Sequence, residues 1–279
     1  MRKILRSLLH RAGYDLIHRS DDSVLVELRA LQDILRLAPQ DYLRWSDSLA
    51  IPASHACLRH LLRIKQIDLL IDVGANRGQF ARLARQVGYT GEIASVEPLS
   101  RYHPDLRAAA AADGRWRIFP MAAGSENTAR DLNVAANDVF SSLYPISEAG
   151  RARFGAQMAV GSVERVQVRT LDSLWPEISG GTPRRVLLKT DTQGHDLEVL
   201  GGATQVLGST HALMTEASIQ NIYAGTPRFF EVATWLESRG FALSGVFPMS
   251  HRAEDLALIE VDAFFTRPLS AAASPVPTV

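Results

Sequence analysis

The sequence contains a single cysteine, Cys57, among its 279 residues. One cysteine cannot build a disulfide framework within the chain or a zinc site made of several thiolates. Scarcity of cysteine is typical of proteins kept in a reducing compartment, so we expect a cytoplasmic location. The sequence also has no hydrophobic run of the roughly 20 residues that a transmembrane helix needs.

An excess of charge of either sign is also missing. Lys and Arg together number 30, as do Asp and Glu, so the formal net charge is zero. Proteins that bind nucleic acid through its phosphates are normally rich in basic residues, so we expect no nucleic-acid partner. The apolar fraction of 46% and the charged fraction of 22% are ordinary for a soluble globular protein.

The N-terminal stretch MRKILRSLLHRAGYDLIHRS lacks the features of a secretory signal peptide. Arg6, His10 and Arg11 interrupt its apolar residues, and no small-residue cleavage site follows. The apolar residues between positions 4 and 9 recur at helical spacing and predict a basic amphipathic helix within residues 1–20. Such a helix either rests on an anionic membrane or a partner, or packs on its own domain with its charges in water.

The chain divides into three segments of different pattern. Residues 1–65 are expected to form a helical extension, because apolar positions in VELRALQDILRL recur every three or four residues. Between residues 66 and 267, short apolar runs alternate with helical stretches, which predicts an α/β domain with a largely parallel sheet. The tail 268–279 is small, polar and proline-rich, and we expect it to be disordered.

Seven apolar runs in the α/β segment predict strands, at residues 68–73, 91–97, 116–122, 185–191, 211–217, 240–247 and 256–266. Helices are expected at residues 78–87, 104–112, 196–207 and 227–239. A long insertion separates the third and fourth strands, and the alternation in its residues 163–171 predicts a half-exposed strand. Long loops in compact domains often cover a binding site, so we expect residues 135–163 to act as a lid.

The segment LLIDVGANRGQF, residues 69–80, predicts a buried strand, a glycine turn and the start of a helix. Gly74 and Gly78 allow the backbone to turn sharply and to approach a ligand without an intervening Cβ atom. The helix then directs its N-terminal amides at that ligand. The glycines do not follow the G-x-G-x-x-G pattern of dinucleotide sites, and no Walker-type lysine follows them. An NAD-dependent oxidoreductase therefore stays only as an alternative.

Glu97 stands at the end of the next predicted strand, in IASVEP. It follows the glycines by roughly 20 residues, the spacing at which a carboxylate accepts hydrogen bonds from both hydroxyls of a ribose. Alone, it would be interpreted as a solvated loop acid. Together with the glycine turn, it predicts a nucleoside-binding site.

The segments DVGANRGQF and VEP resemble the nucleoside-binding part of class I S-adenosylmethionine-dependent methyltransferases. Further along the chain, LLKTDTQGHDLEVLGGA and TEASIQNIYAGTPRFFEVATWLESRGF resemble the FkbM-type family of these enzymes. The resemblance covers about residues 66–266, and it departs from the family pattern at Thr192 and Asp196. It implies a Rossmann-like fold with a seven-stranded, mostly parallel sheet whose last strand is antiparallel.

The resemblance also implies how S-adenosylmethionine is held. The residues expected to cradle its methionine and ribose parts are Gly74, Ala75, Asn76 and Gly78. Glu97 would hold the ribose hydroxyls, and the turn containing Ala122 and Ala123 would border the adenine. Asp72 is placed to reach the amino group of the methionine part, directly or through water.

The segment KTDTQGHDLE carries the candidate catalytic residues. His195 titrates near neutral pH and is either the general base that takes a proton from the acceptor hydroxyl or an exposed helix-start residue. Asp191 orients His195, binds the acceptor or ligates a metal, or else caps the following helix. Gln193 is assigned to substrate binding, and Lys189 is expected to lie along its strand or to extend outward.

Three further residues belong to the expected site. Glu216 ends the fifth predicted strand and, with Asp191, offers oxygen ligands of the kind that Mg²⁺ accepts, although no spacing demands a metal. Ser141 and Ser142 in the expected lid either touch the cofactor or the acceptor, or belong to an ordinary loop.

The sequence therefore predicts an S-adenosylmethionine-dependent O-methyltransferase. The expected acceptor is a hydroxyl of a sugar, of a nucleotide-linked or lipid-linked glycan, or of a polyketide-like natural product. A second alternative is a cofactor-binding or membrane-associated scaffold that keeps the fold without turnover. The sequence does not define the oligomeric state.

Overall fold

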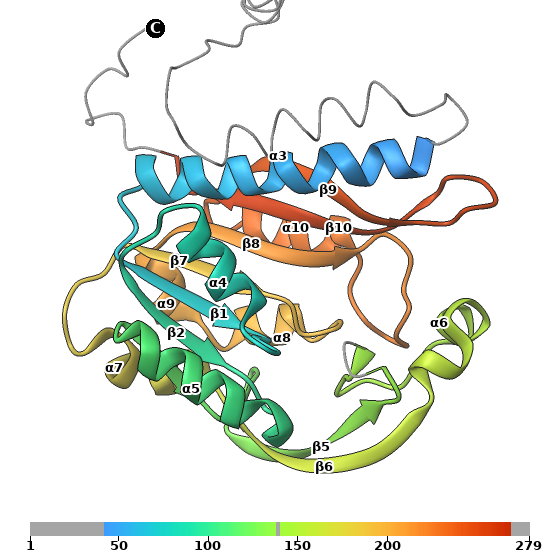
Figure 1. Cartoon of the computed structure of the whole chain (residues 1–279), viewed down its shortest axis with the longest axis horizontal. Helices are drawn as coiled ribbons and strands as arrows, with labels where there is room; N and C mark the ends of the chain where they lie inside the picture. Colours follow the sequence, from blue (N-terminus) through green and yellow to red (C-terminus); the bar gives the residue numbers. More distant parts are fainter. Residues whose placement is uncertain (1–41, 138–139, 269–279) are drawn as a thin grey trace, which may run out of the picture.

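The computed structural model describes residues 42–137 and 140–268 (Figure 1). The predicted amphipathic helix within residues 1–20 and nearly all of the predicted disordered tail lie outside these ranges. Of the expected helical extension, the described part is the single helix α3 (Tyr42–Ile64). In the described part of the chain, no helix is long and apolar enough to cross a bilayer.

A seven-stranded sheet with the order β3-β2-β1-β7-β8-β10-β9 forms the centre of the molecule. Its strands are β1 (Leu69–Val73), β2 (Glu92–Val96), β3 (Trp116–Phe119), β7 (Val186–Thr190), β8 (Thr210–Ser218), β9 (Ala242–His251) and β10 (Leu258–Thr266). The first five in spatial order run parallel, whereas β10 pairs antiparallel with both β8 and β9. The predicted fold, with an antiparallel last strand, is therefore confirmed.

Helices cover both faces of this sheet (Figure 1). One face carries α3, α4 (Gln79–Gln86) and α5 (His103–Asp113), which follows the short 3-10 helix η1 (Ser100–Tyr102). The other face carries α7 (Leu171–Ser179), α8 (Asp196–Gly201), α9 (Thr204–Ser209) and α10 (Phe229–Glu237).

The prediction of one helix over 196–207 is wrong, because the helix is interrupted between α8 and α9. At this break Gly202 packs against the backbone at Gly124. A Cβ atom on Gly202 would lie only 2.1 Å from the carbonyl oxygen of Gly124. This close approach of two chain segments explains a glycine at the break.

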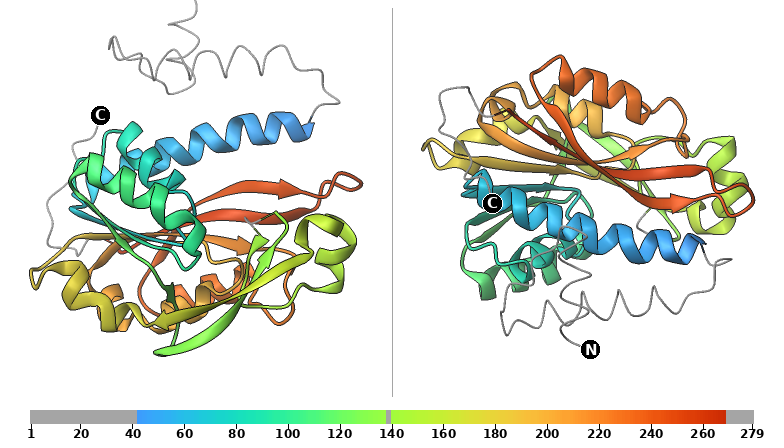
Figure 2. Two further views of the ribbon diagram at one scale, coloured as in Figure 1. Left: turned by 60° about the horizontal axis from the view of Figure 1, so that its bottom comes forward. Right: turned by 90° about the horizontal axis from the view of Figure 1, so that it is seen from above.

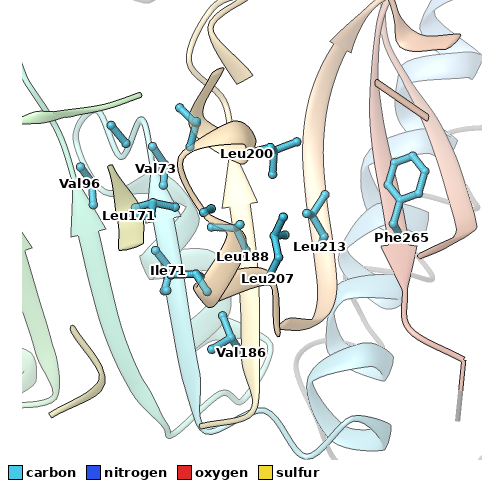
Figure 3. Packing of buried hydrophobic residues seen from close by; sticks show 14 of the residues in the cluster. Ile71, Val73, Val96, Leu171, Val186, Leu188, Leu200, Leu207, Leu213 and Phe265 are labelled. Carbon is cyan, nitrogen blue, oxygen red and sulfur yellow. The ribbon is translucent and has the colours of Figure 1, made fainter. Parts of the chain in front are cut away.

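The alternation of side chains along the strands divides the core into two layers. Figure 3 shows one layer, in which Ile71, Leu188 and Leu213 of neighbouring strands meet Leu171 and Leu207 of the covering helices. The intervening strand residues face the opposite layer, formed with α3, α4 and α5. Both faces of the central strands are buried, which explains their nearly continuous apolar sequence.

The insertion between β3 and β7 builds a second sheet of three strands, β4-β6-β5 (Figure 2). These strands are β4 (Ala122–Ala123), β5 (Thr128–Ala135) and β6 (Val160–Arg169), with α6 (Glu148–Phe154) and η3 (Gly155–Met158) between the last two. The third predicted strand, 116–122, is thus too long, because β3 ends at Phe119 and Ala122 joins the small sheet. The lid function of residues 135–163 stays a prediction.

Candidate functional site

A cavity of about 650 Å³ lies at the carboxyl ends of the parallel strands β1, β2, β7 and β8. It extends beneath α3 toward β10 and β9 and is bounded by residues of the insertion. Its lining includes most of the residues that the sequence predicted for a site: Gly74, Ala75, Asn76, Glu97, Ala122, Ala123, Ser141, Asp191, Gln193, His195 and Glu216. Asp72, Gly78 and Ser142 do not line it.

The glycine turn after β1 is shaped by contacts within the protein. Gly74 has φ +75°, and a Cβ atom there would lie 1.8 Å from the carbonyl oxygen of Asp191. Gly78 has φ +80°, and its Cβ atom would lie 2.6 Å from the Trp116 ring. Gly74 thus allows two strand ends to meet at the cavity. Gly78 lets α4 pack against Trp116, and its assignment to the cofactor cradle stays a prediction.

Glu97 is held in one orientation at the cavity wall. Its Oε2 accepts a hydrogen bond from the Asn76 amide at 2.7 Å, and its Oε1 accepts one from the Leu99 amide at 2.8 Å. Only 4% of its surface is exposed. Burial raises the pKa of Glu97 to about 7, and the two backbone hydrogen bonds only partly oppose this shift. The carboxylate therefore faces the cavity from beside the glycine turn, with lone pairs left for a ligand.

Asp72 and Lys189 form a buried ion pair below the cavity floor. Lys189 Nζ lies 3.1 Å from Asp72 Oδ1 and 3.4 Å from Asp191 Oδ2, and it donates to the Gly74 carbonyl oxygen at 3.1 Å. Burial opposes the charge on Lys189, but Asp191 and Asp72 outweigh it and raise the pKa of the ammonium. Of the two positions expected for Lys189, the structure shows the one on its strand, buried, and not the one extending outward. The contact of Asp72 with the methionine amino group stays a prediction.

Gln193 connects the candidate carboxylates through its side-chain amide. Its Nε2 donates to Asp191 Oδ1 at 3.2 Å and to Glu216 Oε2 at 2.7 Å, while its Oε1 lies 2.9 Å from the Tyr223 hydroxyl. Gln193 has φ +54°, a left-handed conformation that is unusual for a residue with a side chain. The amide thus fixes Asp191 and Glu216 side by side at the ends of β7 and β8.

Asp191 and Glu216 differ in their ionisation. Burial opposes ionisation of Asp191, but Lys189 outweighs it and holds the pKa of this carboxyl below its ordinary value. Burial and the charge of Asp191 raise the pKa of Glu216 well above its ordinary value. Of the two carboxyl groups, Asp191 is therefore the one that ionises more readily.

His195 is buried at the start of α8, so it is not an exposed helix-start residue. Its Nδ1 lies 3.8 Å from Glu198 Oε2 and has no hydrogen-bond partner among the described residues. The ring packs against Tyr144, with 5.5 Å between ring centroids. Burial lowers the pKa of His195, so the imidazole is neutral at pH 7 and able to accept a proton. Within the described residues, no hydrogen bond joins Asp191 to the His195 ring, so Asp191 does not orient the ring directly.

The two serines of the expected lid occupy different environments. Ser141 lines the cavity, and its Oγ accepts a hydrogen bond from the Ala135 amide at 3.2 Å. Ser142 is buried outside the lining, where its Oγ donates to the Gln193 carbonyl oxygen at 2.7 Å. Ser142 thus joins the insertion to the turn after β7, and its assignment to substrate contact stays a prediction.

The structure gives no support for Mg²⁺. Across the described ranges, no group of three or more His, Cys, Asp or Glu residues is arranged to hold a metal ion. Asp191 and Glu216 are bridged by the amide nitrogen of Gln193. This hydrogen-bond donor lies between the two carboxyl groups, where a bound metal ion would need an electron-pair donor instead.

Three charged residues of the cavity were not predicted for the site: Lys189, Glu260 and Asp262. Glu260 and Asp262 belong to β10, where they alternate with Val261 and Ala263 in the sequence EVDA. The sequence signal that could have identified them is the alternation of acids with apolar residues in a strand that also contains two phenylalanines. Their place at the cavity depends on β10 lying between β8 and β9.

Comparison with known proteins gives a family for the chain. A model of the FkbM methyltransferase domain matches residues 72–243, which is more than half of the sequence. The 2-O-methyltransferase NoeI from Sinorhizobium fredii is 25% identical over 236 residues, which cover 79% of this chain and 93% of NoeI.

Solved structures with similar topology are more distant. An FkbM methyltransferase from Methylobacillus flagellatus KT has a TM-score of 0.45 and 14% identity over 87% of this chain. The match covers 60% of that protein, so this chain spans about three fifths of its length. The magnesium protoporphyrin IX methyltransferase from Synechocystis PCC 6803, solved with bound SAM, has a TM-score of 0.42 and 11% identity. That match covers 90% of this chain and all of the other.

Proposed function

This chain belongs to the FkbM methyltransferase family, and we propose that it transfers a methyl group from S-adenosylmethionine to a hydroxyl oxygen. As acceptor we propose a sugar, a glycan or a polyketide-like natural product. One relative supports oxygen as the methyl-accepting atom, because NoeI is named a 2-O-methyltransferase. The remaining support comes from the geometry of the cavity.

The fixed carboxylate of Glu97 beside the glycine turn is the observation that carries the proposal. Both of its oxygens are oriented by backbone amides, at 2.7 and 2.8 Å, which leaves it preorganised to accept hydrogen bonds from two adjacent ribose hydroxyls. The cavity volume of about 650 Å³ lies within the usual range for ligand pockets. The residues therefore fit the cofactor: Glu97 and Asn76 would hold its ribose, and Ala122 and Ala123 would border its base.

The bound cofactor supplies a methyl group already activated by its positive sulfur, because the leaving group is a neutral thioether. The protein's part is to hold the acceptor oxygen in line with that methyl group and to receive the hydroxyl proton. We assign the positioning to Asp191 and Glu216, which Gln193 keeps together. His195 is the proposed general base, because it is neutral at pH 7 and lines the same cavity.

Calorimetric titration with S-adenosylhomocysteine tests the proposal. We expect micromolar binding by the wild type and a loss of at least about tenfold in affinity for Glu97→Ala, since a charged hydrogen-bond partner contributes about 1.5–3 kcal/mol. His195→Ala should keep this binding and lower turnover by about 10²–10⁴-fold. NAD serves as the competing ligand. A preference for NAD, or no binding of S-adenosylhomocysteine, would reject the methyltransferase assignment in favour of the alternatives.

A further inference from the structure

The cavity is larger than the part assigned to the cofactor. Beyond β7 it continues over β8, β10 and β9, with α3 as its roof. The residues that line this half are Ile51, Ser54, His55, Leu58, Met214, Glu216, Met249, Glu260, Asp262 and Phe264. We refer to these residues as the β10 half of the cavity. Its floor is acidic, and its roof and walls are mainly apolar.

Asp262 differs from the other carboxyl groups of the cavity. Asp191 and Glu216 are held by Gln193, and Glu260 accepts a hydrogen bond from Ser250 Oγ at 3.3 Å. Asp262 lines the cavity and is only 8% exposed, yet it has no hydrogen bond or ion pair with any described residue. Asp262 is not among the residues whose side-chain polar atoms are fully buried without a partner, so its carboxyl group is open to the cavity. A ligand in the β10 half would provide the missing partner.

Charge restricts the kind of ligand that this half can take. Five carboxyl groups line the cavity, three of them in the β10 half, and within the described residues Lys189 is the only Lys or Arg side chain that lines it. The ammonium of Lys189 is already shared between Asp72, Asp191 and the Gly74 carbonyl. Burial lowers the pKa of His55, so His55 brings no positive charge at pH 7. A phosphate or carboxylate on the ligand would find no free counter-charge here, and burying a charge without a partner is costly.

We propose that the β10 half is the acceptor subsite and that Asp262 binds a hydroxyl group of a polyhydroxylated acceptor carrying no negative charge. The inference rests on the proposed methyltransferase function and narrows its acceptor to unphosphorylated sugars and glycans. Nucleotide-linked sugars, which the sequence left open, are thereby excluded. Ile51, Met249 and Phe264 provide apolar surface for the CH face of a sugar ring.

The first test measures stability and needs no acceptor. The groups that share the cavity with Asp262 are Lys189 from β7, Asp191 directly after β7, Glu216 from β8, Glu260 from its own strand and His55 from α3. Burial, followed by the charge of Asp191, raises the pKa of Asp262 to about 7. Unfolding lets this carboxyl ionise at lower pH, so the wild type loses stability as pH rises to about 7. The melting temperature of Asp262→Asn relative to the wild type should therefore increase between pH 5 and pH 8.

Asp131→Asn is the matched control, because Asp131 is an exposed strand residue paired with Arg165 on the outside of the small sheet. Its effect on the melting temperature should be small and independent of pH over the same range. If Asp262→Asn instead lowers the melting temperature at pH 8 as much as at pH 5, Asp262 is a structural group. That result would overturn the proposal.

The second test measures methyl transfer from radiolabelled S-adenosylmethionine to methyl glycosides and to the corresponding sugar phosphates and nucleotide sugars. We expect the wild type to prefer the neutral members in kcat/KM by at least about tenfold. Asp262→Ala should raise KM for the neutral members by about five- to thirtyfold, because it removes one hydrogen bond of roughly 1–2 kcal/mol. Its kcat should change much less, and Asp131→Asn should match the wild type.

Two results would overturn the acceptor assignment while leaving the methyltransferase function in place. One is equal or better turnover of the nucleotide sugars. The other is a wild type that binds S-adenosylhomocysteine but methylates none of the neutral glycosides. Failure to bind S-adenosylhomocysteine would instead reject the proposed function itself, so the two failures are distinguishable.

Discussion

At the residue scale, Lys189 is expected to contribute strongly to stability. Its ammonium compensates the fully buried Asp72 and also Asp191. Removing one member of a buried pair leaves an unpaired charge, which typically costs about 3–5 kcal/mol. We therefore expect Lys189→Met to lower the free energy of unfolding by an amount of this order. Urea denaturation at pH 7 measures the change.

The double variant Lys189→Met/Asp72→Asn should recover most of this loss, because it removes the buried charge together with its partner. Arg165→Met is the exposed control: Arg165 and Asp131 form an ion pair at 2.9 Å with both side chains 63% exposed. Pairs of that kind contribute only about 0–1 kcal/mol. A Lys189→Met variant no less stable than Arg165→Met would show that Asp72 does not need a cation.

At the scale of elements, the turn between β1 and α4 can be tested with two glycines that have the same φ. Gly74 and Gly114 both have φ +75°, but a Cβ on Gly74 would overlap the Asp191 carbonyl, whereas one on Gly114 would meet nothing within 4 Å. Gly114→Ala should therefore lower the free energy of unfolding only by the cost of placing an alanine in the left-handed conformation, about 1–2 kcal/mol. Gly74→Ala should cost clearly more and should also weaken S-adenosylhomocysteine binding, because the strand ends must move apart.

Thermal unfolding and calorimetry of the two variants provide the comparison. Equal losses of stability would mean that the contact between Gly74 and Asp191 is not tight. Normal binding by Gly74→Ala would mean that the turn does not position the cofactor.

The elements that the sequence predicted correctly are those with a local signal. β1, β7 and β8 are buried on both faces, so each is a short apolar run, and the turn after β1 is marked by its glycines. The break between α8 and α9 was missed because its cause, the contact of Gly202 with Gly124, joins segments far apart in the sequence. Local periodicity carries no information about such a contact.

The same limit applies to the site. Glu97 was identified because its distance from the glycine turn along the chain is itself a signal. Lys189 was not, since its role depends on the register that sets it beside Asp72 in the neighbouring strand. Asp262 lies opposite Glu216 in the antiparallel pairing of β10 with β8, a position fixed only by the strand order. Residues whose function depends on which strands are neighbours need the structure.

At the scale of the whole molecule, the buried acids should make stability depend on pH. Burial raises the pKa of Glu97, Glu260 and Asp262 to about 7 and that of Asp196 to about 6. Between about pH 4 and pH 7 the folded protein therefore keeps protons that the unfolded chain has lost. More protons bound by the folded state mean that its stability falls as pH rises, until the folded pKa values are passed.

Three histidines, one buried and two half-buried, act in the opposite direction below about pH 6.5. Burial lowers the pKa values of His55, His195 and His211, so their contribution to stability is lost as pH falls. The acids are therefore isolated by comparing the wild type with the triple variant Glu97→Gln/Glu260→Gln/Asp262→Asn, in which the histidines are unchanged. We expect the melting temperature of the wild type without cofactor to fall, relative to that of the triple variant, between pH 5 and pH 8. Parallel melting curves across this range would mean that these carboxyls ionise in the folded protein as readily as in water, and the cavity would then be far better hydrated than its burial indicates.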